Sequence, residues 1–162
     1  MGNEIRRNGF VPVPRAPTQP GAVLDVLFIS RYETDGTALA KALTGMRWHV
    51  LRVRTAGEAL ATLDVVLVPV VICDVEVEGD WKQIVDRVTH SRHPAPVIVA
   101  SGSGDWHLWE EVIDRGGFDL LHKPFEQPAV TAMLDAALHH WETGRIWRTW
   151  DRMEPRKKAS GA

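Results

Sequence analysis

Three side chains of different chemistry each stand at the carboxyl end of a short apolar segment of this 162-residue chain. They are Asp74 after residues 70–73, Ser101 after residues 97–100 and Lys123 after residues 120–122. A carboxylate can act as a nucleophile toward phosphorus. A hydroxyl can donate a hydrogen bond to a phosphoryl oxygen, and an ammonium can balance its charge. The three residue types therefore predict a phosphoryl-transfer site, provided that the fold brings them together.

The elements that must position these residues alternate along the chain. Apolar segments predict strands at residues 23–30, 48–53, 70–73, 97–100 and 120–122. Helical spacing of apolar residues predicts helices at residues 37–46, from 55, at 80–90, from 105, and from 125 to at least 141. Strands separated by helices pair in parallel through right-handed crossovers. We therefore expect a doubly wound α/β sheet with helices on both faces, which binds ligands at the carboxyl ends of its strands.

Two of the predicted helices have a candidate start signal. Thr55, followed three residues later by Glu58, matches a capping box. Asp35 and Thr37 are both candidate N-caps for the first helix, with Gly36 easing the turn between them.

The length of the chain suits one domain, which we place at residues 22–141. Residues 1–21 are expected to form an extended or disordered leader, because they hold four prolines and few apolar side chains. Residues 142–162 are expected to form a helical extension and tail. That extension carries an apolar stripe at helical spacing, expected to pack on its own domain or on a second chain: Ile146, Trp147, Trp150 and Met153.

The composition of the chain argues against some classes of protein. Residues 23–140 hold 10 Lys and Arg against 17 Asp and Glu, so the core is acidic and no whole-protein basic field for nucleic acid is present. No apolar run reaches the length of a membrane helix. Cys73 is the single cysteine, which fits a reducing compartment and a buried, inert thiol. A cytoplasmic location is expected.

Taken in order, Asp74, Ser101-Gly102 and Lys123-Pro124-Phe125 resemble the motifs of the receiver domain of two-component response regulators. The resemblance covers roughly residues 23–141. It implies a flavodoxin-like fold with strand order 2-1-3-4-5. It also implies that Asp74 is the phosphoacceptor, Ser101 the switch hydroxyl and Lys123 the phosphate-contacting lysine of a signalling domain rather than an enzyme. The implied partners are a histidine kinase or phosphotransfer protein and a downstream protein target.

The resemblance departs at the metal pocket. Receivers carry adjacent acidic residues after the first strand, whereas this chain has Ser30, Arg31 and Tyr32 there. Magnesium prefers carboxylate oxygens, so Mg²⁺ is expected to bind weakly, through Asp74 and Glu76. Two arrangements of Arg31 are open. Its guanidinium could pair with Asp74 and replace the metal charge, or it could turn outward into solvent.

About 20 residues remain after the last core helix, too few for an output domain. We therefore expect a stand-alone receiver that signals by protein contact. The alternative is a phosphorylation-independent interaction scaffold. A homodimer could form through the face of the fourth and fifth helices, where Trp106 and Trp109 lie, or through the C-terminal extension. A flavin or nucleotide enzyme is disfavoured, because no glycine-rich phosphate loop follows the first strand.

Overall fold

The computed structural model describes the backbone of residues 21–153 and the side chains of residues 21–144. The expected leader therefore lies, except for Gly21, outside the described residues, as does the tail from residue 154. Five strands are present: β1 Leu24–Ile29, β2 Trp48–Val53, β3 Val70–Asp74, β4 Val97–Ser101 and β5 Asp119–His122. Five helices alternate with them: α1 Glu33–Ala42, α2 Ala56–Val65, α3 Trp81–Thr89, α4 Trp106–Asp114 and α5 Gln127–Met153.

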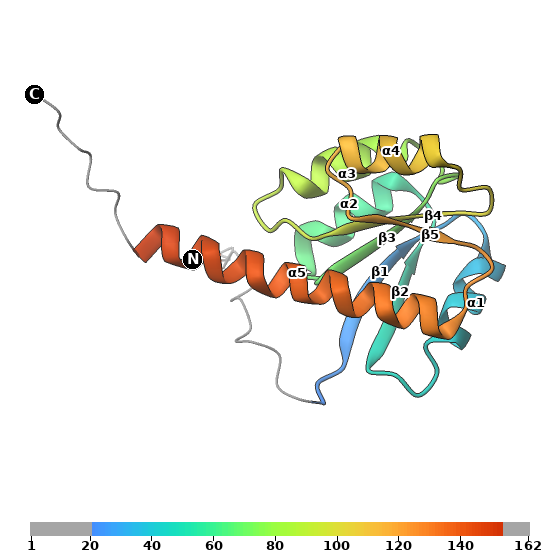
Figure 1. Cartoon of the computed structure of the whole chain (residues 1–162), viewed down its shortest axis with the longest axis horizontal. Helices are drawn as coiled ribbons and strands as arrows, with labels where there is room; N and C mark the ends of the chain where they lie inside the picture. The colour runs from blue at the N-terminus through green and yellow to red at the C-terminus, as the bar shows by residue number, and fades with distance from the viewer. Residues whose placement is uncertain (1–20, 154–162) are drawn as a thin grey trace, which may run out of the picture.

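The five strands form one sheet in the order β2-β1-β3-β4-β5, and every neighbouring pair is parallel. Helices α1 and α5 cover one face, and α2, α3 and α4 cover the other (Figure 1). This arrangement confirms the predicted flavodoxin-like fold, including its strand order. Because all five strands run the same way, their carboxyl ends lie along one edge of the sheet.

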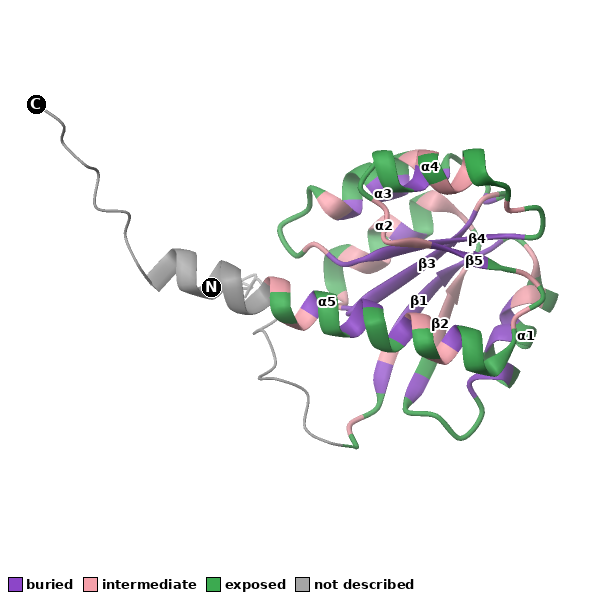
Figure 2. Cartoon of the chain, viewed as in Figure 1, coloured by how far each residue is buried: buried purple, intermediate pink, exposed green. Residues whose placement is uncertain are grey.

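The centre of the sheet explains why its strands have continuous apolar runs. Every residue of β3 and β4 is buried, and these strands lie between the two helical layers (Figure 2). In the edge strand β2 only Trp48 is buried. Strands covered on both faces read as unbroken apolar segments, whereas an edge strand keeps polar residues. Asp74 and Ser101, at the ends of the two central strands, are therefore polar groups held at the rim of the core.

Helix α1 begins earlier than the sequence suggested. It starts at Glu33, and its N-cap, Tyr32, makes no side-chain capping bond. Asp35 and Thr37 are therefore helical residues, so both predicted caps are wrong. Gly36 eases no turn either: it is buried within α1, where a Cβ atom would lie 2.5 Å from Cδ of Arg52 on β2. The glycine leaves room for the Arg52 side chain against α1 and takes no part in a turn.

The other caps follow local chemistry. The Thr55 hydroxyl accepts the Glu58 N–H at 3.1 Å, and the Glu58 carboxylate accepts the N–H of Arg54 at 2.9 Å. The predicted Thr55 cap is confirmed, although the returning bond reaches one residue further back than in a standard capping box. Asp80 caps α3 by accepting the N–H of Lys82, and Asp105 caps α4 by accepting the N–H of Leu108.

Helix α5 continues through Gly144 to Met153 and, in Figure 1, extends past the sheet. The predicted apolar stripe lies on this last part, and its side chains are outside the described residues. In the part of the chain that the structure describes, no helix is both long and apolar enough to cross a membrane.

Candidate functional site

The three predicted site residues lie at neighbouring strand ends. In the register of the sheet, Asp74 pairs with Ala100, the residue before Ser101. The backbone N–H of Lys123 donates to the carbonyl of Ser101 at 2.9 Å, so Lys123, which directly follows β5, lies beside the end of β4. A carboxylate, a hydroxyl and an ammonium are thereby placed on one edge, as the parallel sheet requires.

The Asp74 carboxylate is fully buried and held by three donors. Its Oδ1 atom accepts the backbone N–H of Glu76 at 2.9 Å. Its Oδ2 atom accepts the ammonium of Lys123 at 2.7 Å and lies 3.4 Å from the hydroxyl of Ser30. These contacts engage both oxygens of the carboxylate and hold it in one orientation at the end of β3.

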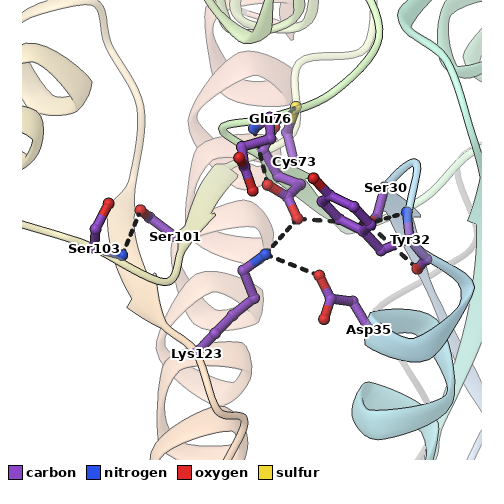
Figure 3. A network of polar contacts seen from close by, with 9 residues as sticks. Ser30, Tyr32, Asp35, Cys73, Glu76, Ser101, Ser103 and Lys123 are labelled. Atoms are coloured by element: carbon purple, nitrogen blue, oxygen red, sulfur yellow. Dashed lines mark hydrogen bonds and ion pairs between the residues drawn. The ribbon is translucent and has the colours of Figure 1, made fainter.

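The ammonium of Lys123 joins two carboxylates. Besides Asp74, it donates to Oδ2 of Asp35 at 2.8 Å. In Figure 3, the side chains of Lys123 and Asp35 approach each other from opposite sides of the site. The lysine side chain is only 15% exposed. Burial by itself would lower the pKa of Lys123. The hydrogen bonds and negative charges of Asp35 and Asp74 outweigh burial and raise this pKa above its ordinary value of 10.5.

The ring of Tyr32 has a cationic group of each of two side chains near it, and one of them is this ammonium. Its nitrogen lies 5.6 Å from the centre of the Tyr32 ring, and the guanidinium carbon of Arg31 lies 5.3 Å from the centre of the same ring. Arg31 is exposed and, within the described residues, makes no ion pair with Asp74. Of the two arrangements left open for Arg31, the structure therefore shows the outward one and not the pair with Asp74. The reason is that Lys123 holds the carboxylate, while Arg31 stacks outward against Tyr32.

The other two predicted site residues are Ser101 and Glu76. The buried Ser101 hydroxyl accepts the backbone N–H of Ser103 at 3.1 Å, which holds the loop after β4 (Figure 3). Glu76 is exposed, and its recorded contact with Asp74 is through its backbone N–H rather than its carboxylate.

Sequence reasoning missed two residues of the site. Asp35 gave no specific signal, since an acid in the first turn of a helix is common for the sake of the helix dipole. Its partner, Lys123, is 88 positions away. Ser30 is fully buried and accepts the N–H of Tyr32 at 3.1 Å. The signal that could have identified Ser30 was its place directly after an apolar strand. Asp74 and Ser101 hold similar positions, because they are the last residues of β3 and β4.

The side chains present do not fit a divalent cation centre at Asp74. A magnesium ion needs several oxygen ligands at short distance. Here one ammonium occupies Oδ2 atoms of both Asp74 and Asp35, and the end of β1 supplies a hydroxyl, Ser30, instead of a carboxylate. Among the described residues, no group of three or more His, Cys, Asp or Glu side chains could hold a metal.

Cys73 lies beside the site without taking part in it. Its side chain is fully buried, and its thiol contacts the carbonyl oxygen of Asp74 at 3.5 Å. Burial, followed by the negative charges of Asp74 and Asp80, raises the pKa of this thiol far above its ordinary value. Such a thiol stays protonated and is a poor nucleophile.

Searches with the sequence find related regulators. Residues of this chain are 34% identical over 73 positions to the transcriptional regulatory protein FixJ of Bradyrhizobium diazoefficiens, covering 44% of this chain and 36% of FixJ. They are 28% identical over 105 positions to the DNA-binding transcriptional regulator NtrC of Klebsiella pneumoniae, covering 64% of this chain and 22% of NtrC. The matches thus span well under two thirds of these relatives. No family model matches the chain.

Solved structures share the fold. A chain described as a response regulator from Chloroflexus aurantiacus has a TM-score of 0.68 and 25% identity, covering 72% of this chain and 98% of that one. The chemotaxis response regulator CheY4 of Vibrio cholerae has a TM-score of 0.64 and 19% identity, covering 72% of this chain and all of CheY4 (100%). At that lower identity the similarity concerns the fold alone.

Proposed function

We propose, on the premise that this chain holds a receiver domain of the response-regulator kind, that Asp74 accepts a phosphoryl group from a partner protein and that the phosphorylated domain signals by protein contact. The observation that carries the proposal is the Asp74–Lys123 pair, with its 2.7 Å contact at the carboxyl ends of β3 and β5. A nucleophilic carboxylate and a fixed cation are the minimum that an acyl phosphate site needs.

The chemistry follows from the contacts. A bond forms between a carboxylate oxygen of Asp74 and phosphorus while the bond from phosphorus to its donor breaks, and the donor keeps that electron pair. For a phosphohistidine donor, the released imidazole then takes up a proton from water. The ammonium of Lys123 lies close enough to Asp74 to pair with the oxygens of the incoming phosphoryl group. The carboxylate is the reacting form, so the step removes no proton from Asp74.

We assign to Ser101 the role of donating a hydrogen bond to an oxygen of the phosphoryl group. It stands on the strand next to Asp74, and its hydroxyl currently accepts a bond from the loop residue Ser103. Rotation of this hydroxyl toward a bound phosphoryl group would give up the bond to Ser103. The loop that leads to α4 would then be released or rearranged. Phosphorylation of Asp74 would in this way change the surface near α4.

The surface of α4 is the proposed route to partners. Trp106 is 63% exposed and stacks on Trp109 with ring centres 5.0 Å apart. Trp109 is anchored to β5, because its ring N–H donates to Asp119 at 3.1 Å. A large exposed aromatic on a rigid base is typical of a protein-binding surface. Residues 23–140 carry 10 Lys and Arg against 17 Asp and Glu, so we assign to this domain contact with protein rather than with DNA.

The test is phosphorylation by a small-molecule donor. The full chain is incubated with acetyl phosphate and its intact mass is measured. We expect an increase by one phosphoryl group in the natural chain and none in Asp74→Asn, because the amide is not a nucleophile at this site. Asp105→Asn serves as the matched control, since it removes an exposed helix-capping carboxylate and leaves the site intact. An unchanged mass for the natural chain would favour the phosphorylation-independent scaffold instead.

A further inference from the structure

Lys123 holds two carboxylates where a metal would need them free. Its nitrogen lies 2.7 Å from Oδ2 of Asp74 and 2.8 Å from Oδ2 of Asp35. An ammonium has three donors, so two of them are directed to the two acids. A divalent ion could use these oxygens only after the ammonium had been displaced from both.

The surrounding residues favour the ammonium over a metal. Ser30, at the end of β1, gives Asp74 a neutral hydroxyl at 3.4 Å. The Tyr32 ring lies 5.6 Å from the Lys123 nitrogen, a distance at which its negative face attracts a cation. The neighbouring Arg31 adds a positive charge, which opposes the entry of a second cation.

Asp35 holds the lysine from the opposite wall. It comes from the first turn of α1, whereas Asp74 comes from β3, so the ammonium is held by side chains of two different elements. The Asp35 side chain is 23% exposed, so the contact is partly shielded from solvent. Removing this one carboxylate would leave the flexible lysine stem with a single anchor.

We propose that the ammonium of Lys123, clamped between Asp35 and Asp74, is the resident cation of this site, so that it works without a divalent metal, and that Asp35 is the positioning residue for that ammonium. The proposal rests on the proposed function where it concerns phosphorylation. Its metal-binding part concerns the unmodified chain and can be tested separately.

The first experiment measures Mg²⁺ binding to the unphosphorylated chain by tryptophan fluorescence and thermal unfolding, with NaCl of equal ionic strength as the control. We expect no Mg²⁺-specific change across the low millimolar range. Lys123→Met frees the two carboxylates and should gain stabilisation by Mg²⁺, which the further change Asp35→Asn should abolish. Specific stabilisation of the natural chain by Mg²⁺ overturns the proposal whether or not the variants fold.

The second experiment compares labelling by acetyl phosphate in EDTA and in Mg²⁺. We expect equal initial rates within about twofold. Labelling that occurs only with Mg²⁺ overturns the inference and leaves the proposed function standing. No labelling under either condition defeats the proposed function, and the Mg²⁺ titration still decides the inference.

The role of Asp35 is tested by substitution. Asp35→Asn should lower the labelling rate in EDTA by about tenfold, whereas Asp35→Glu should restore part of it. The Nζ signal of Lys123 in NMR spectra should lose its protection from solvent exchange in Asp35→Asn and regain it in Asp35→Glu. Glu33→Gln is the matched control, because Glu33 is an exposed acid of the same helical turn. Unchanged protection in Asp35→Asn would show that Asp35 does not position the lysine.

Discussion

At the scale of single residues, the site is governed by one cation shared between two anions. Lys123 lies 2.7 Å from the fully buried Asp74 and 2.8 Å from the partly exposed Asp35. A buried carboxylate that loses its donor keeps the cost of desolvation without compensation. Lys123 therefore serves the stability of the fold as well as the proposed chemistry.

This shared cation predicts a dependence of stability on alkaline pH. The pKa of Lys123 is raised in the folded state above 10.5, its ordinary value. The protonated lysine therefore stabilises the fold fully below pH 10.5, and this stabilisation is lost as the pH rises through the folded pKa. Lys123→Met should lower the free energy of unfolding near neutral pH by about 1–3 kcal/mol, and the difference from the natural chain should narrow at higher pH.

Urea unfolding at a series of pH values measures that difference. Lys82→Met is the matched control, because Lys82 pairs with Glu111 at the surface and its side chain is 36% exposed. Surface pairs of this kind contribute about 0–1 kcal/mol. A difference for Lys123→Met that stayed constant at the highest pH at which both chains fold would contradict the assignment.

At the scale of elements, close approach decides where glycine is required. Gly117 follows α4, and a Cβ atom there would lie 2.8 Å from the carbonyl oxygen of Val112 and 2.6 Å from its Cγ1 atom. The carbonyl belongs to the backbone of α4 and cannot move without disturbing the helix end. Gly57 is the contrasting case: it is exposed within α2, and the single atom near its Cβ position is Thr55 Oγ1 at 3.9 Å.

The two glycines should therefore respond in opposite directions to the same change. Gly117→Ala is expected to lower the free energy of unfolding by roughly 1–3 kcal/mol through overpacking. Gly57→Ala is expected to raise it by about 0.5–1 kcal/mol, because alanine loses less backbone entropy in a helix. Denaturant unfolding of the two variants measures both effects, and equal signs would contradict this account.

At the scale of the whole molecule, the described residues share one hydrophobic core. The buried side chains of both helical layers and of the sheet form a single cluster, which includes Trp48 on β2, Trp81 on α3 and Trp141 on α5. A core that is continuous across the sheet has no internal boundary at which one part could unfold alone.

Unfolding should therefore be a single cooperative transition. Tryptophan fluorescence reports on the packing of the core, and far-ultraviolet circular dichroism reports on the helices. We expect the two signals to give the same urea midpoint and the same slope. Separate midpoints would show that α5 or another layer is stable on its own, which would conflict with the single cluster.

The sequence alone determined the order of elements, the parallel sheet and the edge to which Asp74, Ser101 and Lys123 belong. Apolar runs and helical spacing encode these features locally, and parallel pairing then places all strand ends together. The start of α1 was misjudged, because Asp35, Gly36 and Thr37 carry turn and cap propensities that packing against β2 overrides.

The tertiary structure decided which charges meet. Lys123 and Asp35 are 88 residues apart, and no local pattern links a helical acid to a lysine beyond the fifth strand. Arg31 was a candidate partner for Asp74 by position, yet its side chain lies outward over Tyr32. Local periodicity fixes where a strand ends. The direction of a long charged side chain from that end depends on contacts that exist only once separate elements have packed together.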